Sequence, residues 1–352
     1  MKAREIWQMK KDFGITQKGE YASLYTLSNK KGMKIAVSDY GATLVSILTA
    51  DKDGRIRDVV LGYDDVAGYE KGGAFFGAII GRNANRIKGA CFTINGKTYE
   101  LTQNNFKNNL HSGLDFYSKR MWKVEEADEK HIMLTLDSPD GDQGYPGALD
   151  MKVTYTLDEE NGLTIHYEAV PDQDTVINMT NHSYFNLNGH KSGSVLHHRM
   201  QLLSDAFTPA DAQSIPTGEV CSVDGTPMDF RSTKELGAEI DAAYEPLILG
   251  NGYDHNWVLK NEGRFDKVAE VTGDESGIVM EVWTDRPGVQ VYTANFLENE
   301  AGRNGAVYQK RDAVCLETQN YPDAVHQKNF PEAICKKGET YDTKTAYRFH
   351  IE

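Results

Sequence analysis

Alternation of apolar and polar residues with a period of two is the feature that most constrains how this chain can fold. Between Lys152 and Leu157 every second side chain is apolar, and the same pattern recurs between Leu163 and Tyr167. The intervening residues 158–162 are Asp-Glu-Glu-Asn-Gly, which favour a turn. Successive side chains of a strand point to opposite faces, so each run is typical of a half-buried strand. We therefore predict a β-hairpin over residues 152–167.

Strands are also predicted in three further regions. Two short apolar runs between Cys91 and Leu101 flank Asn95-Gly96, a dipeptide that strongly favours a two-residue hairpin turn. Residues 278–296 hold another pair of runs around the turn-like residues 285–288, and residues 340–351 resemble a final strand. Helical periodicity is scarce, and its best short candidate is Lys234 to Ala243.

These patterns together favour an all-β fold. Strand-like segments recur at intervals of roughly 8–15 residues between turn-forming sequences, as in large sandwiches. The 32 Gly and 18 Tyr suit many strands and turns. No Pro/Ser-rich linker, low-complexity segment or internal repeat divides the chain. We expect a large antiparallel β-sandwich with very few short helices, formed by residues 1–352 as one domain.

Charge and cysteine content exclude several classes of function. The formal net charge is −14, which opposes binding to the phosphates of nucleic acid. The four cysteines are widely spaced without a CxxC pair, so we expect reduced thiols. No run reaches the roughly 18 apolar residues of a membrane span, and the N-terminus lacks the apolar core of a signal peptide. We expect a cytoplasmic monomer or homodimer, unless a leader was removed ahead of residue 1.

Polar residues inside strand-like segments are the most informative about function. Over residues 176–187 the alternation places five polar side chains on one face: Asn178, Thr180, His182, Tyr184 and Asn186. A solvated sheet face is one interpretation, but such faces usually carry Lys, Glu and Thr. Asn, His and Tyr together better suit a ligand rich in hydroxyl groups.

Two loops add candidate donors. Asn85 and Arg86 follow an apolar run, and Arg86 either pairs with a core carboxylate or presents its guanidinium to a ligand. His111 lies in the Asn-rich segment 104–113, where a surface or capping histidine is the common alternative to a functional one.

Strand-like segments near the C-terminus add carboxylates. Asp254 precedes His255 and fits either an Asx turn or a ligand contact. Gln290 shares a strand face with Tyr292. Glu317 follows an apolar run, and a carboxylate there is costly to bury unless it is paired. It is therefore either half of a structural ion pair or a group placed for proton transfer.

Six motifs spread over the chain resemble the aldose 1-epimerase (galactose mutarotase) family. They are GRNANRI (81–87), NNLHSG (108–113), TNHSYFNLNG (180–189), YDHNWVL (253–259), GVQVYTANF (288–296) and LETQNYPDA (316–324). They occur in the family's order, and the resemblance runs from about residue 20 to the C-terminus. It implies a β-sandwich with a sugar site in a concave face, and an isomerase that interconverts the α and β anomers of free aldoses such as glucose and galactose.

The resemblance also implies residue roles. His182 matches the family's catalytic acid and Glu317 its catalytic base. Six residues match sugar-contacting positions: Asn85, Arg86, His111, Tyr184, Asp254 and Gln290. One departure is Ser112, which stands where the family usually has a second Gly and alters the loop that carries His111.

Anomer interconversion explains why such residue types are needed. Opening the pyranose ring removes a proton from the C1 hydroxyl and delivers one to the ring oxygen, and closure on the other face reverses both transfers. One base and one acid suffice, so we expect no catalytic metal or cofactor; whether a structural ion binds is left open. A carboxylate beside His182 is expected to favour the charged imidazole.

Three other functions fit the sequence less well than this one. A hexose-6-phosphate epimerase needs more basic residues than Arg82 and Arg86 near the motifs. A non-catalytic carbohydrate-binding module has no need of both His182 and Glu317. A glycoside hydrolase would use a carboxylate pair such as Asp254 and Glu317, but it leaves His182 without a role.

Overall fold

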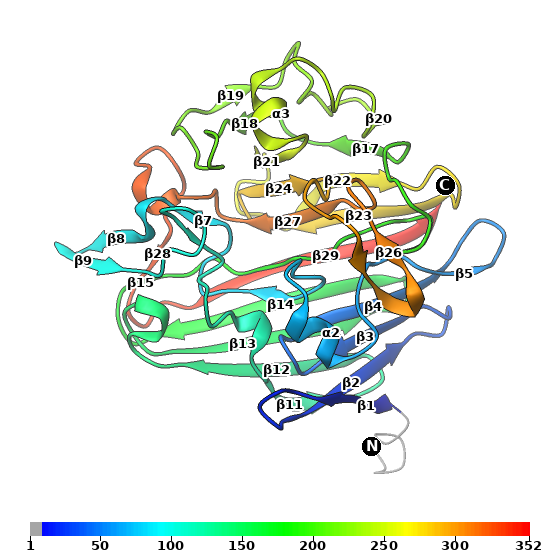
Figure 1. Ribbon diagram of the computed structural model, residues 1–352, viewed down its shortest axis with the longest axis horizontal. Coiled ribbons are helices and arrows are strands. Elements are labelled where there is room, and N and C mark those ends of the chain that lie inside the picture. Colours follow the sequence, from blue (N-terminus) through cyan, green and yellow to red (C-terminus); the bar gives the residue numbers. More distant parts are fainter. Residues whose placement is uncertain (1–8) are drawn as a thin grey trace.

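The computed structural model describes residues 9–352, and its largest sheet has nine strands. In spatial order these are β11 (Lys123–Ala127), β12 (His131–Ser138), β13 (Leu149–Leu157), β14 (Gly162–Pro171), β29 (Tyr341–Ile351), β23 (Ile278–Thr284), β22 (Asp266–Thr272), β17 (Arg199–Leu202) and β20 (Lys234–Glu235). The C-terminal strand β29 lies between β14 and β23 and so joins the two halves of the sheet (Figure 1).

Two five-stranded sheets accompany the large one. The first comprises β1 (Lys10–Ile15), β2 (Tyr21–Ser28), β3 (Lys34–Ser38), β4 (Thr43–Ala50) and β5 (Ile56–Asp58). The second has the order β19 (Cys221–Ser222), β18 (Ala206–Thr208), β21 (Asp254–Val258), β24 (Gly288–Tyr292) and β27 (Cys315–Gln319). This second sheet carries much of the candidate site.

Short two-stranded ladders complete the strands. They are β6 (Ile79–Ile80) with β16 (Thr180–Asn181), β7 (Arg86–Ile87) with β10 (Asn109–Leu110), β8 (Cys91–Ile94) with β9 (Lys97–Glu100), β15 (Thr175–Val176) with β28 (Ile334–Cys335), and β25 (Glu300–Ala301) with β26 (Val307–Tyr308). All named strand pairs within residues 9–352 are antiparallel.

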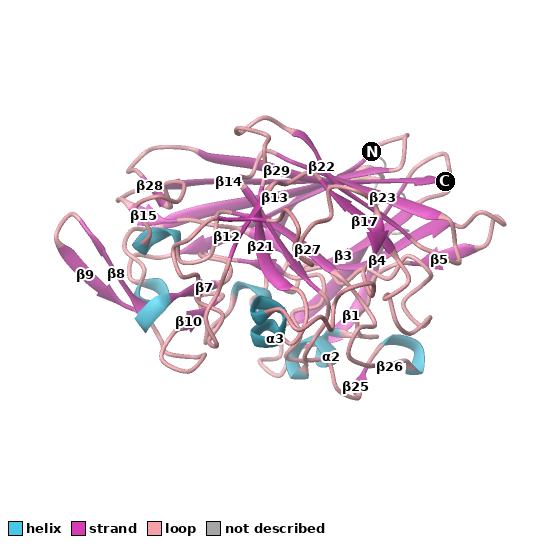
Figure 2. Ribbon diagram, turned by 90° about the horizontal axis from the view of Figure 1, so that it is seen from above, coloured by secondary structure: helices cyan, strands magenta, loops and turns pink. Residues whose placement is uncertain are grey.

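The described α-helices are two single-turn elements, α2 (Val66–Lys71) and α3 (Glu245–Gly250). Asp65 caps α2, because its side chain accepts a hydrogen bond from the Gly68 amide at 3.0 Å. In Figure 2 the long strands β14, β29 and β22 run along one side of the molecule and both helices lie on the other. The expected all-β antiparallel fold with few short helices is confirmed.

Apolar side chains from the whole length of the chain form the main core. The largest buried cluster draws residues from Tyr25 to Phe349, including the inward-facing positions Val153, Tyr155 and Ile165 of the predicted hairpin. That hairpin forms in full, with Val153 opposite Tyr167 and Leu157 opposite Leu163. The hairpin around Asn95-Gly96 and the C-terminal strand are confirmed as well.

Both strands predicted over residues 278–296 form, although not as partners, whereas the predicted helix is wrong. Residues 278–284 and 288–292 are both strands, but they do not form a hairpin: β23 pairs with β22 and β29, whereas β24 pairs with β21 and β27. The helix expected over residues 234–243 is absent, since Lys234 pairs with Met200 as part of a strand. Gly237 then lies so close to Leu196 that a Cβ there would meet the Leu196 side chain and carbonyl at 2.9 Å.

The polar row expected over residues 176–187 is also not a continuous strand. The two-residue strands β15 and β16 and isolated bridges at Asn178 and Phe185 form there, and both faces are buried. The Asn178 side chain accepts from the Asn320 amide at 2.7 Å, and the Asn186 side chain donates to the Asp312 carbonyl at 2.9 Å. These two asparagines hold neighbouring backbone in place, which leaves His182 and Tyr184 of the row to line a cavity.

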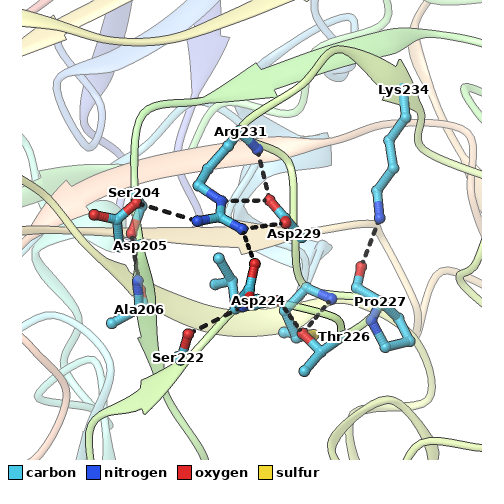
Figure 3. A network of polar contacts seen from close by, with 12 residues as sticks. Ser204, Asp205, Ala206, Ser222, Asp224, Thr226, Pro227, Asp229, Arg231 and Lys234 are labelled. Atoms are coloured by element: carbon cyan, nitrogen blue, oxygen red, sulfur yellow. Dashed lines mark hydrogen bonds and ion pairs between the residues drawn. The ribbon is translucent and has the colours of Figure 1, made fainter.

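An arginine-centred network anchors the loops at the end of the second five-stranded sheet (Figure 3). The Arg231 guanidinium donates to Asp224 and Asp229, each at 2.6 Å, and lies 3.7 Å from Asp205. These contacts tie the segment before β20 to both ends of the β18–β19 region. The loop between β18 and β19 reaches the candidate site through residues 212–214.

The cysteines agree with the expectation of free thiols. All four cysteines are free thiols. Within residues 9–352 no helix is long and apolar enough to cross a bilayer. The prediction that no leader occupies the N-terminus rests partly on residues 1–8, which lie outside the described part of the chain.

Candidate functional site

A cavity of about 650 Å³ opens among the loops that join these sheets. Seven of the eight predicted site residues line it: Asn85, Arg86, His111, His182, Tyr184, Asp254 and Glu317. The eighth, Gln290, lies behind Asp254 and donates to its Oδ1 at 2.7 Å. The volume falls in the usual range for small-molecule sites.

Three adjacent strands supply the acidic side of the cavity. Gln290 on β24 is directly opposite Glu317 on β27, and Asp254 begins the neighbouring strand β21. β21 and β24 have antiparallel partners on both sides, whereas β27 is the edge strand and pairs with β24; sites built on strands suit groups that must keep a fixed geometry. The Gln290 bond fixes Asp254 with one oxygen engaged.

His182 reaches the cavity from the segment after β16. Its amide donates to the Ala78 carbonyl at 3.0 Å, which fixes the backbone. Its imidazole lies between two nearly parallel rings, Tyr184 at 5.1 Å and Phe75 at 6.0 Å between centroids. This stacking restricts rotation of the imidazole, whose Nε2 is 3.5 Å from Glu317 Oε1.

Arg86, Asn85 and His111 come from the β7–β10 ladder. The Asn85 amide donates to His111 Nδ1 at 3.1 Å, and the His111 amide donates to the Asn85 carbonyl at 2.9 Å. The Asn85 bond leaves Nε2 of His111 as the nitrogen that carries the hydrogen in the neutral ring. The Arg86 Nε donates to the Asn105 side chain at 3.0 Å, and this hydrogen bond fixes the orientation of the Arg86 guanidinium.

Burial dominates the protonation of the central pair. It lowers the pKa of His182 to about 4. It raises the pKa of Glu317 well above its ordinary value, an effect that the Asp254 charge reinforces and Arg86 opposes. The sequence-based expectation of a charged imidazole therefore does not hold. Burial shifts both groups of the pair toward their neutral forms, by lowering the pKa of His182 and raising the pKa of Glu317.

The other ionisable groups of the cavity are also shifted. Burial, followed by the nearby His182 and Arg86, holds the pKa of His111 well below its ordinary value, so His111 is neutral. Burial raises the pKa of Asp254, while Arg86 and the Gln290 hydrogen bond lower it. Several such groups in one cavity are characteristic of a site built for proton transfer.

Both central groups keep unused hydrogen-bonding capacity. Within the described residues, His182 Nδ1 and Glu317 Oε2 have no hydrogen-bond partner, and neither does Gln290 Oε1. A buried polar atom left unpaired costs about 1–3 kcal/mol, so these atoms are suited to receive a polar ligand.

Phe75 was missed from the sequence. It contacts His182, His111 and Phe116, the last two edge-on with centroids 5.0 Å apart. An aromatic residue in an apolar run resembles a core residue, so nothing local marked Phe75. Phe296 also lines the cavity, and its position in the VYTANF segment beside Gln290 was the available signal.

Backbone conformation around the cavity is unusual. Five of the lining residues that are not glycine have φ between 54° and 60°: Phe75, Asn85, Phe106, His111 and Ser214. This left-handed region costs an L-residue about 1–2 kcal/mol. Such strain concentrates where side chains must be aimed for function.

Ser112, the departure from the family pattern, has a structural role. Its φ is 58°, a value at which glycine would be unstrained. Its hydroxyl accepts from the Asn83 amide at 2.8 Å and lies 3.0 Å from the Tyr145 hydroxyl. The side chain thus joins the loop carrying His111 to the segment carrying Asn85.

Comparison with known proteins shows the family of this chain. The family model described as aldose 1-epimerase matches residues 23–348. The chain belongs to the aldose 1-epimerase family. The galactose mutarotase of Bos taurus is 42% identical over 320 residues, which are 91% of this chain and 92% of that protein. The aldose 1-epimerase of Escherichia coli K12 is 36% identical over 337 residues, or 95% and 97% of the two chains.

A solved structure gives the same result. The aldose epimerase homologue from C. elegans superposes with a TM-score of 0.87 at 30% sequence identity, covering 94% of this chain and 99% of that one. Membership makes this aldose 1-epimerase homologue an isomerase of carbohydrates.

Proposed function

We propose that this protein interconverts the α and β anomers of free aldoses such as glucose and galactose, by acid–base ring opening and reclosure that requires neither metal nor cofactor. The observation that carries the proposal is the buried His182–Glu317 pair, 3.5 Å apart on the wall of the cavity. Each partner keeps one polar atom unpaired within the described residues. Two groups that share one proton are what ring opening needs.

The number of protons that His182 and Glu317 share fits the reaction. Burial favours the neutral imidazole by lowering the pKa of His182 and the neutral carboxyl group by raising the pKa of Glu317, so in this proposal Glu317 holds the shared proton before the sugar reacts. Moving it to His182 leaves the net charge of the pair unchanged and produces the carboxylate and imidazolium of the family pattern. Glu317 then takes the C1 hydroxyl proton while His182 protonates the ring oxygen. On closure the two groups exchange roles.

The remaining groups hold the sugar while C1 turns. Asp254 accepts hydrogen bonds from sugar hydroxyls, with its orientation set by Gln290. Arg86 and the neutral His111 donate to sugar oxygens as negative charge develops. Asn85 positions His111, and Tyr184 supports one face of the imidazole. Rotation about C1–C2 needs this anchoring at C3 to C6 and freedom at C1.

A free rather than phosphorylated sugar suits this cavity. Arg86 is the one lysine or arginine among the lining residues that the structure describes. Arg82, the other basic candidate, is 1% exposed and donates to the carbonyls of Pro146 and Gly147, both at 2.9 Å. We also propose that residues 1–352 form one domain, which is supported by a main core drawn from Tyr25 to Phe349.

Polarimetry tests the activity directly. Freshly dissolved α-D-glucose and α-D-galactose would be followed in EDTA with wild type, His182→Asn and Glu317→Gln. The wild type should accelerate relaxation over the buffer blank, and each variant should lose about 10²–10⁴-fold. His166→Asn, a change at a histidine paired with Asp342 on the nine-stranded sheet, should match the wild type. A wild type indistinguishable from the blank with both sugars would overturn the proposal.

A further inference from the structure

One cluster in the cavity wall combines three different metal-binding side chains. His182, Cys315 and Glu317 each offer a donor atom, and these atoms all lie within 4.8 Å of one another. Within residues 9–352 it is the one group of three such residues so placed. Acid–base chemistry uses His182 and Glu317 but gives Cys315 no role.

The strand geometry explains how the cluster forms. Cys315 and Glu317 are two residues apart on β27, so their side chains share one face of the sheet. His182 approaches that face from the segment after β16. All three residues are buried, and Cys315 is 0% exposed. Its neighbour across the sheet is Tyr292, which lines the cavity.

The donors are not committed elsewhere. Within the described residues, the buried atoms His182 Nδ1 and Glu317 Oε2 have no hydrogen-bond partner. Ligation of a cation by these two atoms therefore breaks no hydrogen bond that they make within the described residues. Tetrahedral zinc, with bonds of about 2.0–2.3 Å, sets its donors roughly 3.3–3.7 Å apart, so a contraction of about 1 Å is enough.

The donor set selects the cation. One thiolate, one imidazole and one carboxylate suit Zn²⁺ and its substitute Co²⁺, whereas Mg²⁺ and Ca²⁺ prefer oxygen ligands alone. Three protein ligands leave a fourth position open, and two of the three line the cavity. We propose that His182, Cys315 and Glu317 form a binding site for Zn²⁺, and that the bound cation inhibits the enzyme by occupying its acid–base pair.

The binding step is balanced as a proton exchange. Metal–sulfur and metal–oxygen bonds form, the Cys315 S–H bond and the Glu317 O–H bond break, and both protons leave to the buffer; burial favours the protonated form of both groups by raising the pKa of each, so proton release accompanies binding. No oxidant or reductant takes part. Once the imidazole and the carboxylate both ligate the cation, neither is able to move a proton to or from a sugar.

Cobalt provides a direct readout of the site, because a thiolate bound to Co²⁺ gives a charge-transfer absorption band. Chelator-stripped protein would be titrated with Co²⁺ and then with Zn²⁺. We expect the band in the wild type and its loss when Zn²⁺ displaces Co²⁺. Cys335→Ala is the matched control, since Cys335 is a second buried thiol, beside the Glu339 carbonyl. It should keep the band.

Variants of Cys315 decide the assignment. Cys315→Ser and Cys315→Ala should both abolish the band, with circular dichroism showing which of them folds as the wild type does. Absence of the band in the wild type, or its persistence in a folded Cys315 variant, would overturn the proposal.

Inhibition is tested separately and rests on the proposed mutarotase function. Zn²⁺ should slow wild-type turnover reversibly with EDTA, and loss of the thiolate should weaken that inhibition about 10–100-fold. Equal sensitivity of wild type and Cys315→Ser would overturn the inhibitory part. A protein that binds Co²⁺ through Cys315 but turns over no sugar would refute the proposed function and leave the metal site standing.

Discussion

Replacing Ser112 by Gly and by Ala separates the two physical effects combined at that position. Both changes remove the hydroxyl, which is fully buried and pairs with the Asn83 amide at 2.8 Å and the Tyr145 hydroxyl at 3.0 Å. The unmet buried donor costs about 1–3 kcal/mol. Only Gly relieves the left-handed backbone at φ 58°, a gain of about 1 kcal/mol after its larger unfolded-state entropy is subtracted.

We therefore expect Ser112→Ala to lose about 2 kcal/mol of unfolding free energy and Ser112→Gly about 1 kcal/mol. For 352 residues at about 2.1 cal/mol/K each, the unfolding entropy is about 0.74 kcal/mol/K. The expected falls in Tm are then about 3 °C and about 1.5 °C. Because His111 directly precedes Ser112, KM for the sugar should rise more in the alanine variant.

Calorimetry and urea unfolding measure the stabilities, and polarimetry measures KM. Tyr145→Phe is the matched control, since it removes one partner of the Ser112 hydroxyl and leaves the strained backbone unchanged. An alanine variant as stable as the glycine variant would refute the strain argument. A glycine variant as stable as the wild type would refute the value assigned to the two hydroxyl contacts.

Three further predictions address the site and its support. In EDTA, kcat/KM at pH 5 should keep most of the value that it has at pH 7. A group with a pKa of about 4, such as His182, is only about one-tenth protonated at pH 5, whereas an ordinary imidazole is about 97% protonated. A fall in kcat/KM with a midpoint near pH 6.5 would contradict the neutral His182. Phe75→Ala should lower kcat about tenfold by freeing the imidazole, with Phe75→Tyr restoring it; equal rates in the alanine variant and the wild type would refute this positioning role. Asp274→Asn should cost about 1–2 kcal/mol at pH 7, since the His198 hydrogen bond holds the pKa of Asp274 below its ordinary value. In urea unfolding the difference from wild type should begin to shrink as pH falls below about 4, the pKa of an unfolded aspartate, and should shrink further toward the lowered folded-state pKa; a constant difference would refute the linkage.

Local sequence patterns predicted the parts of the fold in which the contacting residues are close together in the sequence. The hairpin over 152–167 forms because its turn and both alternating faces lie within one short segment. Residues 278–296 show the limit of that reasoning, since their alternation is correct but their partners come from β21, β22, β27 and β29. The helices α2 and α3 span six residues each, too short for a 3.6-residue period to be visible.

The site followed from sequence in its residues but not in its electrostatics. Seven predicted residues line the cavity. They were predictable because their residue types are unusual for the strands and loops that carry them. The neutral His182 was not predictable, because its pKa depends on complete burial beneath Phe75 and Tyr184. Asn178 and Asn186 were indistinguishable from site residues by type, and only the fold showed that they bind backbone instead.

The residues with left-handed backbone conformation around the cavity limit how far this enzyme can be stabilised without loss of catalysis. Glycine is the replacement that relieves such backbone, and at Asn85 or His111 it would also delete a side chain that lines the cavity. Selection for heat tolerance and selection for turnover thus oppose each other at these positions. Thermostable relatives are expected to gain their extra stability in the distant nine-stranded sheet, where the two demands are independent.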